Sequence, residues 1–215
     1  MQTPCQNQQK PETTANRLFF PHFLKKIQVG LVNQTISGNI DHMYSSNETS
    51  GVDRPMTTAP ELKIATIDDI PTILAFIREL ADYEHMLDQV VATEESLRYW
   101  LFDQHKAEVL LALRHGKPVG FALFFHNFST FLGKAGIYLE DLYVRKEARG
   151  TGCGKALLRE LARITVERGC GRLEWNCLDW NQPSIDFYRS LGARPMEDWT
   201  LYRLTGEELL TLARS

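Results

Sequence analysis

The sequence of 215 residues has no apolar run that approaches the ~18 residues of a membrane-spanning helix, so we expect no transmembrane segment. Residues 1–17 are rich in Gln, Thr, Pro and Asn and lack the apolar stretch that a secretory signal needs. Positive charge is not in excess, because 24 Lys and Arg residues stand against 27 Asp and Glu residues, for a formal net charge of −3. A nucleic-acid-binding protein usually carries a basic excess or a basic face, so the composition disfavours that class.

Cysteine is scarce, and its spacing forms no known framework. The four cysteines, at positions 5, 153, 170 and 177, match neither a C-x-x-C redox pair nor a zinc-binding pattern, so we expect no metal site. We interpret those in the folded part as small buried apolar residues. The pattern suits a reducing compartment, and we expect a cytoplasmic protein.

The first 55 residues differ in composition from the rest of the chain. They are polar, apart from an apolar stretch at residues 18–32, and residues 43–55 have the composition of a linker. We expect residues 1–55 to be a disordered or non-native extension and residues 56–215 to form one domain. Two explanations of the extension stay open: a disordered tail, or translated sequence upstream of a true initiator at Met56.

From residue 62 onward, alternating and helical apolar patterns follow one another. We expect strands at residues 62–67, 107–114, 117–128, 135–144, 172–178 and 199–204. We expect helices at about residues 70–80, 93–102, 154–169, 181–192 and 206–213. Three consecutive strands with short connections predict an antiparallel meander, and the strand–helix–strand that follows predicts a parallel crossover. The expected fold is therefore α/β, with a mixed sheet and flanking helices.

The stretch RGTGCGK, residues 149–155, places three glycines between a strand and a helix, where a phosphate can approach backbone N–H groups. It does not fit a P-loop, because Arg149 stands at the first glycine position and Ala156 replaces the hydroxyl that binds magnesium. It does not fit a dinucleotide-binding fingerprint, because Lys155 occupies the third glycine position. The pattern R-x-x-G-x-G remains, and Arg149 and Lys155 add positive charge to it.

This loop and two further segments, RELADYEHMLDQV and WNQPSIDFY, resemble the GNAT superfamily of N-acetyltransferases. The three segments together are similar to its spermidine/spermine subgroup, which includes diamine and thialysine acetyltransferases, and the resemblance covers about residues 62–213. It implies the GNAT fold, acetyl-CoA as cosubstrate, a small amine as acceptor and a homodimer. The implied cofactor-binding residues are Leu142, Tyr143, Val144, Arg149, Gly150, Thr151, Gly152, Cys153, Gly154, Lys155, Asn181, Ser184 and Tyr188.

Two residues are candidates for the chemistry of acetyl transfer. The Tyr188 phenol is neutral at pH 7 and can donate a proton to a departing thiolate, the role that the resemblance implies. The resemblance also implies that Glu140 takes the proton of the amine, directly or through water, and that Asp141 is an acidic partner of the substrate. Adjacent strand residues point to opposite faces, so both carboxylates reach one site only if the strand contains a bulge.

The identity of the amine stays open at this point. Tyr83, Glu84 and Asp88 match the amine-recognition segment of the subgroup, and we expect them to bind the substrate. Leu87 stands where polyamine-specific members carry an acid, and His85 replaces an aromatic residue. A shorter amine, such as a diamine or a lysine-like amino acid, therefore competes with a polyamine.

Two other functions compete with small-amine acetylation. The same fold supports acetylation of protein lysines or N-termini, and it supports a non-catalytic domain that senses CoA. The presence of both Glu140 and Tyr188 counts against a sensor, which needs neither residue.

Overall fold

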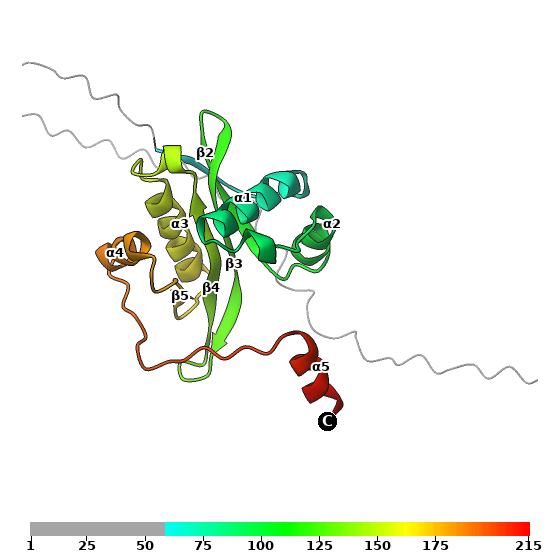
Figure 1. Cartoon of the computed structure of the whole chain (residues 1–215). Helices are drawn as coiled ribbons and strands as arrows, with labels where there is room; N and C mark the ends of the chain where they lie inside the picture. Colours follow the sequence, from blue (N-terminus) through cyan, green and yellow to red (C-terminus); the bar gives the residue numbers. More distant parts are fainter. Residues whose placement is uncertain (1–58) are drawn as a thin grey trace, which may run out of the picture. The chain divides into compact units, whose positions relative to one another are not determined.

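The computed structural model describes residues 59–215, and the expectations for residues 1–55 and for Met56 lie outside the described residues. Five strands form one sheet in the order β1-β2-β3-β4-β5 (Figure 1). Their bounds are β1 Glu61–Ile64, β2 Glu108–Arg114, β3 Lys117–Ser129, β4 Lys134–Val144 and β5 Leu173–Trp175. The first four strands pair antiparallel, and β4 and β5 pair parallel. The predicted meander and crossover are therefore confirmed.

Helices cover both faces of this sheet. The helices are α1 Ile70–Tyr83, α2 Glu94–Leu97, α3 Cys153–Glu167, α4 Gln182–Ser190 and α5 Gly206–Arg214. A π-helical segment, Arg98–Asp103, continues α2, and short 3-10 turns lie at Ile67–Asp69, Leu87–Gln89 and Lys146–Ala148. The side chains of Thr93 and Ser96 cap the start of α2 through reciprocal hydrogen bonds of 3.1 and 2.9 Å, which form a capping box.

The alternation of β2 divides the core into two halves. Val109, Leu111 and Leu113 pack on one face with Ile73 and Phe76 of α1. Leu110 and Ala112 face the other side, where buried leucines of α3 cover them, namely Leu157, Leu158 and Leu161. Each fully buried leucine or phenylalanine contributes about 1.5–3 kcal/mol to stability. The sheet is thus packed between α1 and α3.

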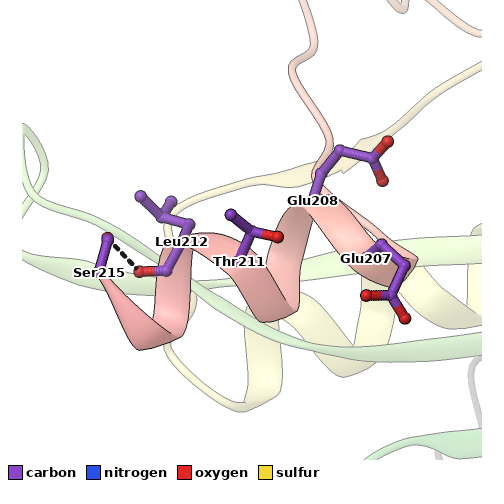
Figure 2. Close-up of a pocket in the computed structure, with 5 residues that line it drawn as sticks. All are labelled: Glu207, Glu208, Thr211, Leu212 and Ser215. Carbon is purple, nitrogen blue, oxygen red and sulfur yellow. Dashed lines mark hydrogen bonds between the residues drawn. The ribbon is translucent and has the colours of Figure 1, made fainter.

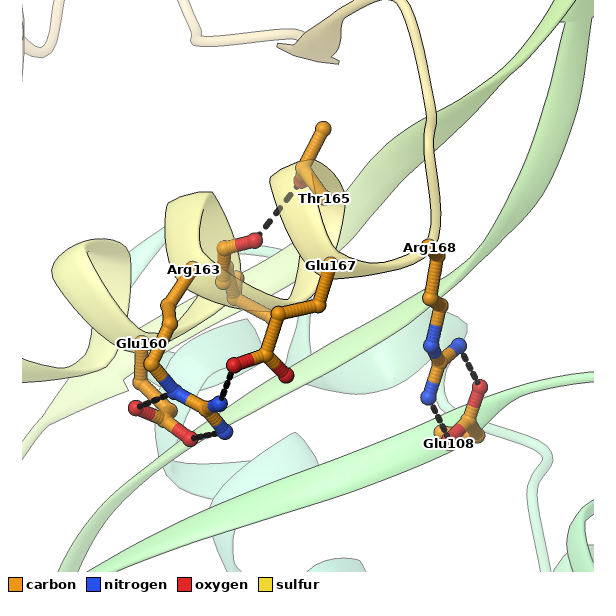
Figure 3. A network of polar contacts seen from close by, with 7 residues as sticks. Glu108, Glu160, Arg163, Thr165, Glu167 and Arg168 are labelled. Atoms are coloured by element: carbon orange, nitrogen blue, oxygen red, sulfur yellow. Dashed lines mark hydrogen bonds and ion pairs between the residues drawn. The ribbon is translucent and has the colours of Figure 1, made fainter. Parts of the chain in front are cut away.

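Polar contacts fix the end of α3 against the sheet (Figure 3). Arg168, at the C-terminal cap of α3, donates two hydrogen bonds to the Glu108 carboxylate of β2, at 2.5 and 2.7 Å. Within the helix, Arg163 pairs with Glu160 at 2.6 Å and also with Glu167. The Thr165 hydroxyl donates to the Leu161 carbonyl oxygen at 2.7 Å. These contacts hold the direction of α3, whose N-terminus meets the glycine-rich loop.

Two strand predictions are corrected by the structure. Strand β5 ends at Trp175 instead of continuing to residue 178, because β4 and β5 pair only through residues 137–139 and 173–175 and then separate. The expected strand at residues 199–204 is wrong, since this stretch has no regular structure and pairs with no strand in the described part of the chain. Residues 194–205, which we call the C-terminal arm, are all exposed instead.

The terminal helix α5 forms as predicted, but all its residues are exposed. Figure 2 shows one face of α5, where a hollow of about 470 Å³ is bordered by Glu207, Glu208, Thr211, Leu212 and Ser215. The Ser215 hydroxyl donates to the Leu212 carbonyl oxygen at 2.8 Å. None of the residues predicted for the site lies in this hollow. Across residues 59–215, no helix is both long enough and apolar enough to cross a membrane.

Candidate active site

The separation of β4 from β5 opens a cleft of about 1180 Å³. The two strands pair at Ile137, Tyr138 and Leu139, and beyond Trp175 the chain turns away toward α4. The cleft lies at the carboxyl ends of two neighbouring parallel strands, the usual place for a ligand in sheets of this kind. Its walls bring together the end of α1, the second half of β4, the glycine-rich loop, the start of α4 and part of the C-terminal arm.

A β-bulge in β4 brings the two predicted carboxylates to the same cleft. Leu123 of β3 pairs with Asp141 and Phe124 pairs with Leu139, so Glu140 is an extra residue with no partner. Glu140 and Asp141 both line the cleft. Regular alternation would have placed them on opposite faces, and the bulge removes that constraint. The strand therefore contains the bulge that both carboxylates need in order to reach one site.

Negative charge gathers at one end of the cleft. Burial, together with the charges of Glu140 and Glu84, raises the pKa of Asp141 to about 7. Burial also raises the pKa of Glu84. Asp179, which follows β5, also lines the cleft. A bound ammonium group would offset the repulsion among these carboxylates, so this end suits a cationic amine.

The raised pKa of Asp141 makes stability depend on pH. Its folded-state pKa of about 7 exceeds the ordinary 3.8, so the folded state binds the proton more tightly and loses stability as pH rises from about 4 to about 7. In Asp141→Asn this loss disappears. We expect the wild type to lose about 2 kcal/mol more unfolding free energy than the variant between pH 5 and pH 8, measured by urea denaturation. Asp88→Asn is the control, and parallel profiles for wild type and Asp141→Asn would contradict the interpretation.

Tyr188 faces the same cleft from α4. Its ring packs against Trp175 at 5.0 Å between centroids and against Phe187 at 5.5 Å, so β5 and α4 hold it in place. Burial raises the pKa of Tyr188, with further contributions from the charges of Cys177, Glu84 and Tyr83. The phenol is therefore fully protonated at neutral pH. It is able to donate a proton or a hydrogen bond to a leaving thiolate.

The glycine-rich loop adopts the geometry that an anion-binding helix start needs. Gly150 and Gly152 have φ values of 75° and 90°, in the left-handed region that is strained for residues with a side chain. A Cβ atom on Gly154 would lie 3.5 Å from the Phe187 ring, so α3 starts close against α4. The backbone N–H groups of the first turn of α3 have no carbonyl partner within the helix, and Arg149 and Lys155 line the cleft beside them.

The hydrogen bonds between β3 and β4 show which backbone groups of β4 face the gap between β4 and β5. The Arg145 N–H donates to the Val119 carbonyl oxygen at 2.9 Å, so the groups of Val144, one residue earlier, point away from β3. By the same alternation Leu142 points toward the gap and Tyr143 toward β3. Leu142 and Val144 therefore offer polar backbone groups to an extended ligand. An amide-containing arm that ends in a phosphate fits this edge and the adjoining loop.

Most of the predicted site residues line the cleft, and two do not. Thr151 is turned inward, where its hydroxyl donates to the Ala148 carbonyl oxygen at 2.6 Å. Asp88 lies in an exposed turn and does not border the cleft. Asn181 caps α4 by accepting from the Ser184 N–H at 3.4 Å, and both residues border the cleft. The site-residue assignments therefore remain predictions, supported by position for all but Thr151 and Asp88.

Several residues of the cleft were not anticipated from the sequence. Cys177 and Asp179 line it because β5 ends early, and the acidic residue directly after an apolar strand was the available signal. Trp199 and Arg203 line it from the arm that had been expected to form a strand. No pattern within the arm itself distinguishes a strand in a sheet from an extended wall beside a cleft.

Comparison with known proteins assigns the class. Residues 74–193, more than half of the chain, match the model of the acetyltransferase (GNAT) family. The chain therefore belongs to the GNAT family and is an N-acetyltransferase, and enzymes of this family use acetyl-CoA.

Individual relatives indicate which acetyltransferases this chain resembles. A thialysine N-epsilon-acetyltransferase of Sus scrofa is 39% identical over 159 residues, which cover 67% of this chain and 92% of the relative. An L-ornithine N5-acetyltransferase of Arabidopsis thaliana is 31% identical over 194 residues, covering 69% of this chain and 85% of the relative. Among solved structures, an integron cassette protein from the mobile metagenome of V. cholerae has a TM-score of 0.63 at 29% identity, covering 74% of this chain and 99% of that one.

Proposed function

We propose that this enzyme transfers an acetyl group from acetyl-CoA to the primary amine of a lysine-like amino acid, a diamine or a small polyamine. The observation that carries the proposal is the bulge that brings Glu140 and Asp141 into the cleft that Tyr188 faces. Carboxylates lie at one end of this cleft, and Arg149 and Lys155 lie beside the glycine-rich loop. A cationic amine would therefore bind at the carboxylates and an anionic cosubstrate at the glycine-rich loop, so that their reacting groups meet between the two.

Acetyl-CoA supplies the thioester whose carbonyl carbon receives the amine. Each residue then has one task in a ternary complex. An amine with a pKa near ~10.4 is protonated at neutral pH, and Glu140 accepts the proton that it must lose, directly or through water. The nitrogen–carbon bond forms and the carbon–sulfur bond breaks, while Tyr188 gives its proton to the departing thiolate. The second proton that the nitrogen loses as the amide forms passes to the Tyr188 phenolate and restores it. An N–H on the gap-facing edge of β4 stabilises the oxyanion that develops.

The form of the amine follows from the acidic end of the cleft. Glu84, Glu140 and Asp141 lie together there, whereas Asp88 lies outside it and Leu87 contributes no charge. A short substrate with one side-chain amine needs fewer spaced carboxylates than a long polycation. The named relatives act on thialysine and on L-ornithine, which are amino acids with a side-chain amine. We therefore favour a lysine-like amino acid or a diamine over spermine.

A thiol-release assay with acetyl-CoA tests the proposed substrate class. The acceptors are thialysine, ornithine, lysine, putrescine, spermidine and a histone-tail peptide at equal concentration. We expect kcat/KM to be highest for a small amino acid or diamine, and at least tenfold lower for the peptide, because a tenfold preference needs only about 1.4 kcal/mol. Glu140→Gln is the matched control and should lower turnover with every acceptor. A preference for the peptide would favour the protein-acetyltransferase alternative, and no thiol release with any acceptor would favour a CoA sensor.

We further propose that the enzyme acts as a homodimer whose interface covers the C-terminal arm. Met196, Trp199, Leu201, Tyr202 and Leu204 of the arm are all strongly exposed, and Tyr202 is 89% exposed. Trp199, Thr200, Leu201 and Arg203 border the cleft, whereas Tyr202 and Leu204 do not. Exposed apolar surface of this kind marks an interaction site. A second copy that covers Tyr202 and Leu204 would fix the arm as a wall of the cleft.

A further inference from the structure

Arg149 makes its contacts across the cleft and not only along its own loop. Its Nε donates to the Val144 carbonyl oxygen at 2.9 Å. Its guanidinium carbon lies 4.7 Å from the centroid of the Tyr83 ring and 5.7 Å from that of Tyr143. A guanidinium over an aromatic ring at this distance is attracted to it electrostatically. Arg149 therefore joins the glycine-rich loop to the last residue of α1.

Tyr83 in turn joins α1 to the start of α4. Its hydroxyl donates to the Asn181 side-chain oxygen at 3.1 Å, and its ring lies 6.0 Å from that of Trp180. Asn181 is only 5% exposed, and this hydrogen bond is partly buried. Since Tyr83, Arg149 and Asn181 all border the cleft, the contacts form one chain across it.

The end of α1 is held in one conformation. The Met86 N–H donates to the Ala81 carbonyl oxygen at 2.8 Å, and His85 adopts a left-handed φ of 61°. This is the hydrogen bond and backbone geometry of a Schellman cap, here with histidine where glycine is usual. The His85 ring stacks on Trp180 with centroids 6.0 Å apart. The residues after Tyr83 thus keep a fixed position relative to α4, and Tyr83 cannot move far without disturbing Glu84.

The contacts of Arg149 use groups that a CoA-type ligand also needs. Val144 is one of the two residues whose backbone groups face the gap between β4 and β5, and its carbonyl oxygen is the one that Arg149 holds. An amide N–H that paired with this oxygen would replace the Arg149 Nε. Arg149 directly precedes Gly150 in the loop where a phosphate would lie against the start of α3.

The following inference rests on the proposed function. We propose that, when the cosubstrate binds, Arg149 gives up its contacts with the Tyr83 ring and the Val144 carbonyl oxygen and binds the cosubstrate phosphates instead. Tyr83 is the positioning residue in this exchange. Binding of the cosubstrate then breaks the contact between Arg149 and Tyr83. Tyr83 directly precedes Glu84 at the acidic end of the cleft. Cosubstrate binding and amine binding are thereby coupled through Tyr83, and by linkage each substrate changes the affinity of the other by the same factor.

A double-mutant cycle with coenzyme A as the probe tests the exchange. Titration calorimetry gives the Kd for CoA of the wild type, Tyr83→Leu, Arg149→Gln and the double variant. Arg149→Gln should weaken binding about tenfold or more, because a charge-assisted hydrogen bond is lost. Tyr83→Leu should tighten binding about two- to fivefold in the wild-type background, because a competing cation–π contact is removed. In the Arg149→Gln background, Tyr83→Leu should change nothing.

Two further variants keep the result interpretable. Tyr83→Phe keeps the ring and removes the hydrogen bond to Asn181, so its Kd for CoA should stay close to that of the wild type. Tyr83→Met replaces Tyr83→Leu if the latter fails to fold by circular dichroism. If Tyr83→Leu weakens CoA binding by the same factor in the wild-type and Arg149→Gln backgrounds, Tyr83 is only a wall of the cleft. The proposed exchange would then be overturned. A wild type that binds no CoA would instead contradict the proposed function itself.

Discussion

Replacing Tyr188 with phenylalanine is expected to lower kcat for acetyl transfer about a hundredfold, the low end of the contribution of a general acid. The ring that packs on Trp175 at 5.0 Å is retained, so the fold and the cleft should be unchanged. Only the hydroxyl that would protonate the departing thiolate is lost. The Kd for CoA should therefore stay within about threefold of the wild-type value, because the hydroxyl acts in the transition state and not in binding.

Steady-state thiol release and calorimetry on the same preparations measure these two quantities. Tyr99→Phe is the matched control, because Tyr99 lies on the segment after α2, outside the cleft, and should leave kcat unchanged. Because burial raises the pKa of Tyr188, ionisation of this phenol should cause no loss of wild-type activity below about pH 10. Unchanged turnover in Tyr188→Phe would remove Tyr188 from the role of the acid.

The candidate site was largely predictable where local patterns impose geometry. Adjacent acids in an apolar strand cannot both face one cleft unless the strand bulges, and the bulge lies at Glu140. A run of glycines before an amphipathic segment predicts a phosphate-sized loop, and Gly150 and Gly152 take up the left-handed conformations that only glycine adopts freely. In both cases a chemical constraint on a few neighbouring residues fixes the backbone.

The failures share a physical cause, which is that they depend on distant partners. The stretch at residues 199–204 alternates like a strand, but a strand exists only where another strand offers hydrogen bonds, and in the described part of the chain none does. The prediction that Arg149 binds a phosphate stays untested, but the sequence did not reveal that its guanidinium lies over Tyr83, which is 66 residues earlier in the sequence (149 minus 83). No sequence spacing encodes a contact between the end of α1 and the loop before α3.

The exposed arm leads to the second large expected effect. In a variant that carries both Tyr202→Asp and Leu204→Asp, the charges would have to be buried in the interface of the proposed homodimer, and association should be lost. We expect light scattering after size exclusion to show a dimer for the wild type and a monomer for the variant. Because Trp199 and Arg203 border the cleft, loosening the arm should also lower kcat/KM roughly ten- to a hundredfold.

Val166→Asp is the matched control for this experiment, since Val166 is 77% exposed on α3 and lies outside the arm. It should remain dimeric and active. Tyr202 and Leu204 do not border the cleft, so a fall in activity upon their replacement reflects the placement of the arm and not the loss of a group that contacts the substrate. A wild type that is monomeric and fully active would refute the proposed homodimer. A variant that becomes monomeric but keeps full activity would show that one copy of the chain completes the cleft by itself, with its arm in place.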